Sequence, residues 1–402
     1  MKLFQKLIVA PATLGLLIPS AAFAEEIKLA ELSNYSSSKE VKSISDFDPA
    51  EEIAVTNSRV DGLESRFNDF EAGSFSSTTV MDGGAAFLIG AADGGSSEAL
   101  TTEYVWDIDL DTSFTGEDNL EVGIAAGNSP GTDTGGVLDF GEATSDALKV
   151  IDINYTFPLG EKLTMKVGDS LKVSKSFDNA CAYSGLTDEL GHCGDHKAHQ
   201  AGGDATVGGQ YDFGNGFTIG AGISGEGGST DGLFSKEGTD VFGGNVAYSN
   251  DNYALSVAYA TVEAATATDN GVKKDLLDSV YWGVIGSYTF DDPTPLSSIS
   301  VGYGTGTVDS SPQAGQANIT TDSNSWFVGL GFDEVGPGSV GIAVGTDGLI
   351  SDGTDEDMLY EAYYAFDIND SMSQTVGVYI QENNAAGSED ETGIVALTEF
   401  SF

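Results

Sequence analysis

The sequence has few positively charged residues: 16 lysines and arginines against 63 aspartates and glutamates, a formal net charge of -47. Nucleic acids repel so negative a chain, and we expect no nucleic-acid partner. Prolines number only 9, whereas glycines number 53 and aromatic residues make up 10%. The aromatic content argues against a disordered chain. Few prolines with many glycines and aromatics favour a large antiparallel sheet.

Long hydrophobic runs are also lacking, apart from one at the N-terminus. Lys2 and Lys6 precede the apolar residues 7–19, and the small residues AAFA follow at 21–24. This order predicts a secretory signal peptide over residues 1–24. The alternative, an uncleaved anchor, is disfavoured because a spanning helix needs about 20 apolar residues. Residues 25–49 are rich in serine and predict a linker.

Sixteen segments between residue 74 and residue 402 alternate apolar and polar residues. Segment 105–114 is an example, because its two kinds of side chain fall on opposite faces of a strand. Trp106, Ile108, Leu110 and Phe114 lie on one face, and Asp107, Asp109 and Asp111 lie on the other. Three aspartates on one face need water, so the second face must be wet.

The connections between these segments alternate between short and long. TGEDN (115–119) and GNG (214–216) are short. The eight long loops cover about 91–100, 128–147, 170–202, 226–240, 263–279, 307–321, 347–357 and 382–390. Transmembrane β-barrels have tight turns at one end and long loops at the other. The sequence therefore predicts an all-β fold, a 16-stranded antiparallel transmembrane β-barrel over residues 74–402.

A soluble sandwich or propeller is the alternative, since it has the same alternation. The signal peptide and the aromatic residues that end the apolar faces favour the barrel, whose outer face would contact outer-membrane lipid. These aromatics are Tyr104 and Trp106, Tyr155 and Phe157, Tyr281 and Trp282, and Tyr363 and Tyr364. The last segment, IVALTEFSF, also ends on an aromatic residue, Phe402.

Residues 50–73 contain the only long helical pattern after the signal peptide. Apolar residues recur at heptad spacing, which predicts a short coiled-coil helix in the periplasm that joins three barrels into a homotrimer. The residues of this trimer seam are Ile53, Val60, Leu63, Phe67 and Phe70. A single amphipathic helix on the barrel rim is the alternative, because fewer than three full heptads are present.

Two consecutive segments resemble the porins of cyanobacteria, a family described as carbohydrate-selective or iron-uptake porins. The first is NSRVDGLESRFNDFEAGSFSSTTVMDGGAAFLIGA (57–91), and the second is TTEYVWDIDLDTSFTGEDNLEVGIAAGN (101–128). The resemblance covers roughly residues 1–24 and 50–402 and is strongest over 57–128. Family members usually carry an S-layer-homology domain between signal peptide and helix, and residues 25–49 are too few to form one.

The resemblance implies a porin of the cell outer membrane through which small hydrophilic solutes, carbohydrates and inorganic ions diffuse passively. It also implies assembly by the barrel-assembly machinery, with Phe402 as the terminal recognition residue. Two alternatives remain open at this point: a structural barrel that bridges membrane and wall, and a metal (iron) uptake porin. No enzyme signature and no cofactor motif is found, so we expect neither catalysis nor a cofactor.

The third long loop, 170–202, differs in composition from the rest, and in sixteen-stranded porins this loop narrows the pore. We therefore expect it to set selectivity. The predicted pore constriction comprises Lys166, Lys172, Lys175 and Lys197, with Asp107, Asp109 and Asp111. Opposed lysines and aspartates would create a transverse field across the passage.

The same loop contains both cysteines and all three histidines of the chain. Cys181 and Cys193 are expected to form a disulfide in an exported protein, the alternative being two free thiols. His192, His196 and His199 would share one face of a helix and could bind a metal ion. The alternative for these histidines is a solvated loop that titrates with pH.

Overall fold

The computed structural model describes residues 78–94, 99–129, 137–138, 140, 144–226, 230, 232–235, 238–263, 267–269, 272–274, 278–291, 295–310, 319–384 and 388–402. The predicted signal peptide, linker and coiled-coil helix lie outside these residues, as do the seam residues Ile53, Val60, Leu63, Phe67 and Phe70. Their assignments stay predictions.

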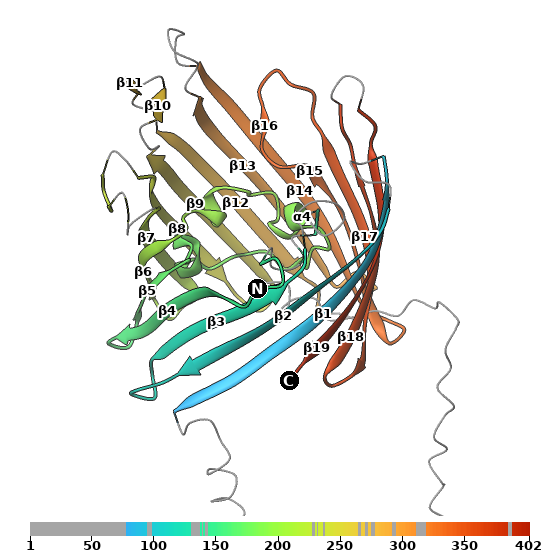
Figure 1. Cartoon of the computed structure of the whole chain (residues 1–402), viewed down its shortest axis with the longest axis horizontal. Coiled ribbons are helices and arrows are strands. Elements are labelled where there is room, and N and C mark those ends of the chain that lie inside the picture. Colours follow the sequence, from blue (N-terminus) through green and yellow to red (C-terminus); the bar gives the residue numbers. More distant parts are fainter. Residues whose placement is uncertain are drawn as a thin grey trace, which may run out of the picture. The chain divides into compact units, whose positions relative to one another are not determined.

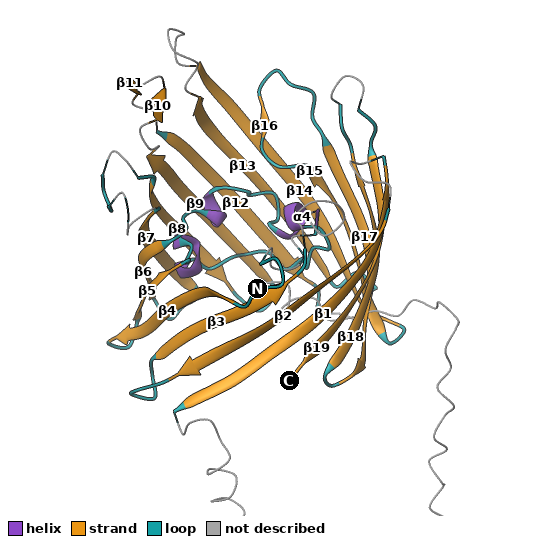
Figure 2. Ribbon diagram, in the orientation of Figure 1, coloured by secondary structure: helices purple, strands orange, loops and turns teal. Residues whose placement is uncertain are grey.

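In the described part of the chain, sixteen long strands form a closed antiparallel barrel (Figures 1 and 2). The first eight are β1 (Thr79–Asp93), β2 (Leu100–Thr112), β3 (Asn119–Gly127), β4 (Lys149–Leu159), β5 (Leu163–Asp169), β6 (Ala205–Asp212), β7 (Phe217–Gly225) and β8 (Asp240–Ser249). The others are β9 (Tyr253–Glu263), β12 (Ser279–Thr289), β13 (Ser298–Ser310), β14 (Ile319–Val335), β15 (Gly338–Thr346), β17 (Met358–Asn369), β18 (Met372–Gln381) and β19 (Glu391–Ser401). The predicted fold class, including the number of strands, is confirmed.

The barrel closes where its first and last strands pair. β1 and β19 are antiparallel, with a continuous register from Gly84 opposite Ser401 to Asp93 opposite Thr392. One residue beyond this register, the backbones of Gly83 and Phe402 exchange hydrogen bonds of 3.0 and 3.1 Å. Phe402 therefore belongs to the closed sheet, as the alternating apolar end of the sequence suggested.

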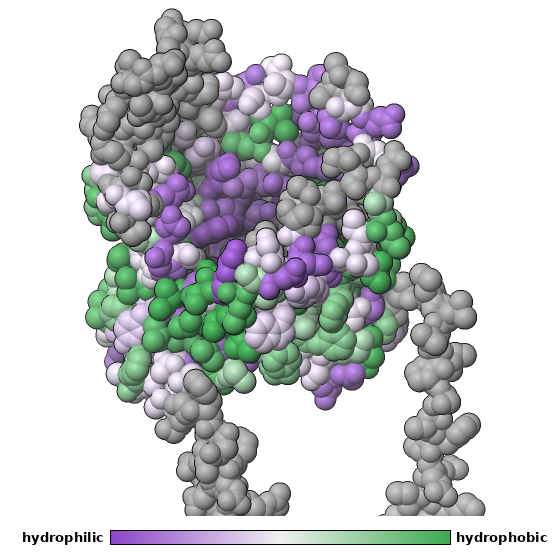
Figure 3. All heavy atoms as spheres, viewed as in Figure 1, coloured by the Kyte–Doolittle hydropathy of each residue, from purple (hydrophilic) through white to green (hydrophobic). Residues whose placement is uncertain are grey.

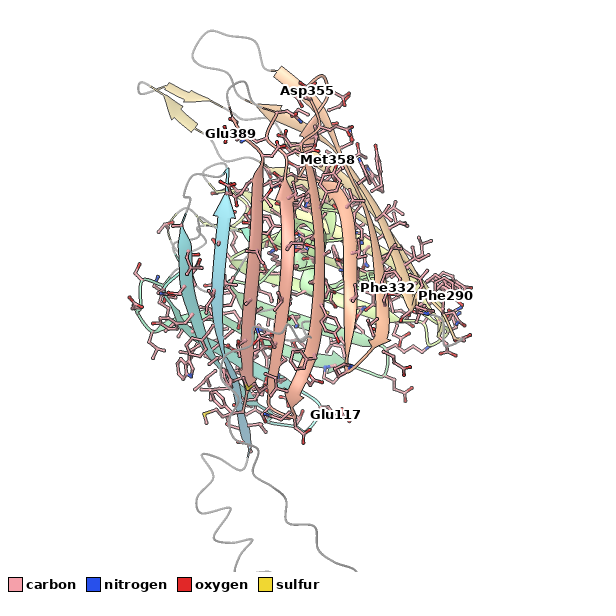
Figure 4. The ribbon with its side chains drawn as sticks, turned by 90° about the vertical axis from the view of Figure 1, so that its right-hand side faces the viewer. Glu117, Phe290, Phe332, Asp355, Met358 and Glu389 are labelled. Carbon is pink, nitrogen blue, oxygen red and sulfur yellow. A yellow bond between two sulfur atoms is a disulfide. The ribbon has the colours of Figure 1, made fainter. Side chains whose placement is uncertain are left out.

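Short turns and long loops alternate around most of the barrel, but the predicted long loop 91–100 is reduced to residues 94–99, because β1 and β2 extend into it; it is no longer than the β2–β3 turn, 113–118. Figure 4 shows the two ends: Asp355 and Glu389 from long loops lie at the upper end, and Glu117 from a short turn lies at the lower end. Two long loops contain strands that were not predicted. These are the hairpin β10 (Ala267–Asp269) and β11 (Val272–Lys274), and the two-residue strand β16 (Ile350–Ser351), which pairs with β14.

The two faces of the strands differ as the alternation requires. In β1, Phe87 is 53% exposed on the outer face, whereas its neighbours Ala86 and Leu88 are buried on the inner face. Apolar residues such as Val246, Val284, Val301, Ile342 and Val378 are also exposed. Figure 3 shows hydrophobic residues over the outside of the strands in the foreground and hydrophilic residues inside the opening above them. The apolar face points outward.

One part of the aromatic prediction is wrong. Tyr281 and Tyr363 were assigned to the apolar outer face together with Trp282 and Tyr364. Tyr281 and Tyr363 are buried inside the barrel, whereas Trp282 is 51% exposed. Consecutive residues of a strand point to opposite faces, so two adjacent aromatics cannot both face lipid.

Helices are few in the described residues, and each has four residues or fewer. They are η2 (Val173–Ser176), α4 (Asp188–Gly191) and η3 (Ala198–Gln200). None of the helices in the described ranges has the length and hydrophobicity that a membrane-spanning helix requires. All three belong to the connection between β5 and β6, which forms the candidate site.

Candidate functional site: the third long loop inside the barrel

The third long loop, which comprises residues 170–204 between β5 and β6, lies within the ring of strands (Figures 1 and 2). Its leucines Leu186 and Leu190 are completely buried in an apolar cluster. Phe327 of β14, Leu359 of β17 and other inward side chains of the wall complete this cluster. Part of the inner face is therefore dry, because the third loop packs on it. This packing fixes the loop inside the barrel.

Glu361, on the inner face of β17, is the main polar anchor of the third loop. The carboxylate oxygen Oε1 accepts hydrogen bonds from Tyr183 Oη (2.7 Å) and Leu186 N (2.8 Å). Oε2 accepts hydrogen bonds from Thr187 N (2.7 Å) and Thr187 Oγ1 (2.6 Å). Burial and the charge of Glu361 raise the pKa of Tyr183 well above its usual range, so the phenol remains a donor. Glu361 thus holds two adjacent segments of the loop on the wall.

Two wall serines bind the backbone of the loop. Ser300 Oγ accepts hydrogen bonds from the backbone nitrogens of Ala182 and Tyr183, both at 3.0 Å. Ser325 Oγ donates a hydrogen bond of 2.7 Å to the carbonyl oxygen of Gly194. These bonds satisfy loop backbone groups that burial would otherwise leave unpaired. The loop is therefore fixed through its main chain as well as through its leucines.

Two wall glycines provide space for the loop. A Cβ atom on Gly302 would lie 1.7 Å from the carbonyl oxygen of Cys193. A Cβ atom on Gly283 would lie 1.6 Å from Oδ2 of Asp195. Any larger residue at either position would collide with the loop, so part of the glycine content serves this close approach.

A disulfide joins Cys181 to Cys193 within the loop, as predicted, with a Cα–Cα distance of 6.1 Å. Cys193 is completely buried and is in contact with the wall at Gly302. The disulfide closes the segment that carries Tyr183, Leu186 and Thr187. It therefore restrains the part of the loop that Glu361 binds.

His199 forms a buried network of its own. Its Nδ1 lies 2.5 Å from Asp195 Oδ2, and its Nε2 lies 2.8 Å from Ser256 Oγ on β9. Asp195 also accepts hydrogen bonds from the backbone nitrogens of Lys197, Ala198 and His199. Burial raises the pKa of Asp195, but the hydrogen bond and charge of His199 outweigh it, and the pKa is lower than usual. His199 thus anchors the loop and lies apart from the other two histidines.

His192 and His196 lie beside Glu189 at the end of α4. One potential ligand atom from each of the three residues lies within 4.8 Å of the others. Nδ1 of His196 contacts Oε2 of Glu189, and the two imidazole rings are perpendicular with their centroids 6.2 Å apart. Burial raises the pKa of Glu189, but His196 and His192 outweigh burial and lower it overall. Glu189 had no assigned role in the sequence analysis.

Of the four lysines of the predicted constriction, Lys166 lies on β5, and the other three, Lys172, Lys175 and Lys197, lie in the third loop. Lys166 lies opposite Gly208 of β6 in the register of the sheet. A Cβ atom on Gly208 would contact Ser176 of the third loop. The negative charges of Glu121 and Asp152 attract the ammonium group of Lys166, whereas the positive charge of Lys175 in η2 repels it. Lys172 Nζ donates a 3.2 Å hydrogen bond to Gln200 within the loop, and the charge of Lys197 acts on Glu189.

Acidic residues cover the inner wall beside Lys166. Asp107, Asp109 and Asp111 alternate with the outward residues of β2, and Asp107 is buried. The carboxylate of Asp109 is repelled by the negative charges of three neighbours, Asp107, Glu121 and Asp152. Because Glu121 and Asp152 act on both Asp109 and Lys166, the basic and acidic groups lie side by side on neighbouring strands. The transverse field between opposed lysines and aspartates stays a prediction.

A cavity of about 450 Å³ lies between the third loop and the short-turn end. The loop contributes Tyr183 and Ser184 to its lining, and the turn region contributes residues 333–334 and 336–340. The loop therefore has open space on the side that faces the short turns.

Comparisons with known sequences do not assign the chain to a family. No protein-family model matches the chain. An uncharacterized protein of Nostoc sp. is 40% identical over 85 residues, which make up 20% of this chain. The matched part spans only 15% of the Nostoc protein.

Comparisons with solved structures identify the fold. OprB of Pseudomonas putida has a TM-score of 0.59 at 12% identity, over 81% of this chain and 94% of that chain. An anion-selective porin from Comamonas acidovorans has a TM-score of 0.54 at 12% identity, over 81% and 99% of the two chains. A loop-deletion mutant of OmpT, an outer membrane protein of Vibrio cholerae, has a TM-score of 0.51 at 10% identity, over 81% and 99%. The chain thus has the fold of these outer-membrane proteins.

Proposed function

We propose that the protein is an outer-membrane porin through which small hydrophilic solutes and inorganic ions diffuse passively. The observation that carries this proposal is the third long loop, which Glu361, Ser300 and Ser325 fix inside a closed barrel. A barrel with an apolar outer face fits a lipid bilayer, and its polar lumen fits water and dissolved ions. The fold shared with solved porins supports the same function.

We propose further that the third loop sets selectivity, and that cations pass more readily than anions. The narrowest section of a channel controls which ions pass. Glu121 and Asp152 partly offset the charge of Lys166, which we assign to this section. The charge of Lys172 acts on Asp188, and that of Lys197 acts on Glu189. The lysines of the loop are therefore balanced locally, and the remaining carboxylates of the lumen favour cations.

Planar-bilayer recording on the refolded mature protein tests both parts of this proposal. We expect discrete conductance steps, with a reversal potential in a salt gradient that indicates cation preference. Refolding is checked independently by the β-sheet signal in circular dichroism. Folded protein without conductance steps would refute the porin, whereas steps with anion preference would refute only the assignment of selectivity.

The homotrimer stays a prediction from the heptad residues Ile53 to Phe70. A trimeric porin gives conductance steps that arrive in groups of three and a mass in mild detergent of three chains. Deletion of residues 50–73 should reduce the mass to one chain if the predicted helix holds the trimer together. A monomeric mass for the complete mature protein would contradict the trimer.

A further inference from the structure

The cluster of Glu189, His192 and His196 has the composition of a transition-metal site. Two imidazoles and one carboxylate suit Zn²⁺, Cu²⁺ or Ni²⁺, whereas Mg²⁺ and Ca²⁺ prefer oxygen ligands alone. The potential ligand atoms lie within 4.8 Å of one another. Bonds to a tetrahedral zinc ion would place them about 3.3 Å apart. Rotation of these side chains would have to bring the ligand atoms to this spacing.

A second observation points to a ligand at the same place. The side chain of His196 is only 6% exposed. Its Nε2 is buried and has no hydrogen-bond partner among the described residues. A buried polar nitrogen without a partner is costly, because it has lost its bonds to water. A metal ion would provide the missing interaction.

The cluster lies beside a second long loop, the connection between β15 and β17. Oε2 of Glu189 lies 4.0 Å from the place of a Cβ atom on Gly348, in the connection between β15 and β17. The charge of Glu189 also acts on Asp347 of the same connection. Oδ1 of Asp188 lies 3.3 Å from Nε2 of His192. The cluster therefore lies between the third loop and a second long loop, with Asp188 and Asp347 as additional negative charges near a bound cation.

We propose that Glu189, His192 and His196 bind one divalent transition-metal ion inside the barrel, and that the bound ion reduces the passage of cations. Three protein ligands leave a coordination position for water, as in catalytic zinc sites. The bound ion adds positive charge to the third loop. The binding step stands on the cluster alone, whereas the effect on cations rests on the proposed porin function.

Metal binding is measured first, in an assay that does not depend on channel activity. Refolded protein in detergent is titrated with ZnCl₂ by calorimetry and with CoCl₂ by visible absorption, which reports the coordination geometry. We expect one ion per chain and a Co²⁺ spectrum of low coordination number. The double variant His192→Gln/His196→Gln should bind at least about tenfold more weakly, since both imidazole ligands are lost. Glu189→Gln provides a second test at a partly exposed residue if the double variant does not fold.

Glu356→Gln is the matched control for Glu189→Gln, since it removes the same charge in the neighbouring loop without a place in the cluster. It should bind Zn²⁺ as the unsubstituted protein does. Absence of Zn²⁺ binding by the folded protein, or unchanged binding by the folded double variant and by Glu189→Gln, would overturn the site.

The effect on passage is then measured by adding ZnCl₂ to single channels, with MgCl₂ as the control ion. We expect Zn²⁺ to lower the cation conductance, and a chelator to restore it, in the unsubstituted protein but not in the double variant. Conductance steps without Zn²⁺ binding would refute the metal site and leave the porin intact. Binding by folded protein that gives no steps would refute the porin and leave the site intact, whereas binding without an effect on current would refute the role in passage.

Discussion

The hydroxyl of Tyr183 donates a hydrogen bond of 2.7 Å to Oε1 of Glu361, a residue 178 positions later in the chain. This bond connects the third loop to the opposite part of the barrel wall. Both partners are buried, so no water competes for the bond. It identifies Glu361 as the residue whose loss would release the loop most directly.

Replacement of Glu361 by Gln should loosen the third loop. The amide has only one acceptor oxygen, and its NH₂ group would face the donors of Thr187. We expect the free energy of unfolding to fall by about 3 kcal/mol, since bonds to a buried charge are lost. Single-channel recordings should show a larger and noisier conductance. Tyr183→Phe, which removes one donor, should have a smaller effect in both measurements, and an unchanged conductance in both variants would argue against the anchor.

Gly302→Ala should prevent the loop from reaching its place. The new Cβ atom would overlap the carbonyl oxygen of Cys193 at 1.7 Å, and neither a Cβ atom nor a main-chain oxygen can rotate away. We expect a lower melting temperature and an altered conductance. Gly286→Ala is the matched control, because its nearest neighbours, Ala254 and Leu255, would lie at an ordinary 3.6 Å. Equal effects of the two substitutions would show that the loop contact is not the cause.

Removal of the disulfide by Cys181→Ser/Cys193→Ser should destabilise the loop more than the barrel. Closing a loop with a sequence separation of 12 contributes roughly 3 kcal/mol in the chain-entropy model. Limited proteolysis should cut within residues 181–193 in the variant and leave the strands intact. Single-channel recordings of the variant should show a noisier current, and a reductant added to the unsubstituted protein should have the same effect. A variant that resists proteolysis, together with a current that the reductant does not change, would contradict this role.

Asp118 makes the stability of the β2–β3 turn depend on pH. Its carboxylate accepts hydrogen bonds from Tyr155 Oη (2.6 Å), from the backbone nitrogens of Phe114 and Thr115, and from the hydroxyls of Ser113 and Thr115. The hydrogen bond from Tyr155 is the largest cause that lowers the pKa of Asp118 far below its usual value. The stabilisation is therefore complete above the ordinary pKa of aspartate and decreases as the pH falls below it.

The test of this turn is urea unfolding of Asp118→Asn at several pH values. The variant should be less stable than the unsubstituted protein at neutral pH, and the difference should shrink in acid. Glu117→Gln, in the same turn (Figure 4), is the matched control because its side chain is exposed. A difference that stays constant below pH 4 would contradict the assignment.

Selectivity should respond to Lys166 more than to a distant lysine. Lys166→Gln leaves the nearby Glu121 and Asp152 without their positive neighbour, so the reversal potential should shift toward stronger cation preference. Lys162→Gln removes the same charge at a short turn, where Lys162 Nζ is bonded to the carbonyl oxygen of Phe213. We expect Lys162→Gln to leave the reversal potential unchanged, and a shift of the same size there would indicate a nonspecific effect of net charge.

The barrel could be predicted from local pattern because its two environments, lipid and lumen, impose a period of two on every strand. Asp107 and Trp106 show this pattern clearly, and the structure places them on opposite faces. The same rule, applied strictly, would have separated Tyr281 from Trp282. It would also have marked Leu359 as unusual, since this apolar residue shares the inner face of its strand with Glu361.

The contacts of the third loop could not be predicted in this way, since they join residues far apart in sequence. Nothing local links Ser300 to Tyr183 or Ser256 to His199. The grouping of His199 with the other histidines assumed one helix, but α4 ends at Gly191 and Cys193 has a φ of 53°. The chain therefore turns away before residue 199, and Glu189 takes the place beside His192 and His196.

The seam between β1 and β19 makes closure of the barrel depend on its last strand. Gly83 and Phe402 meet only when the whole barrel sequence is present. A chain interrupted before β19 would leave β1 and β18 as open edges, and each unpaired backbone group would cost several kcal/mol in hydrocarbon. Such a fragment would carry this cost in a bilayer, whereas the pairing of β1 with β19 removes both edges.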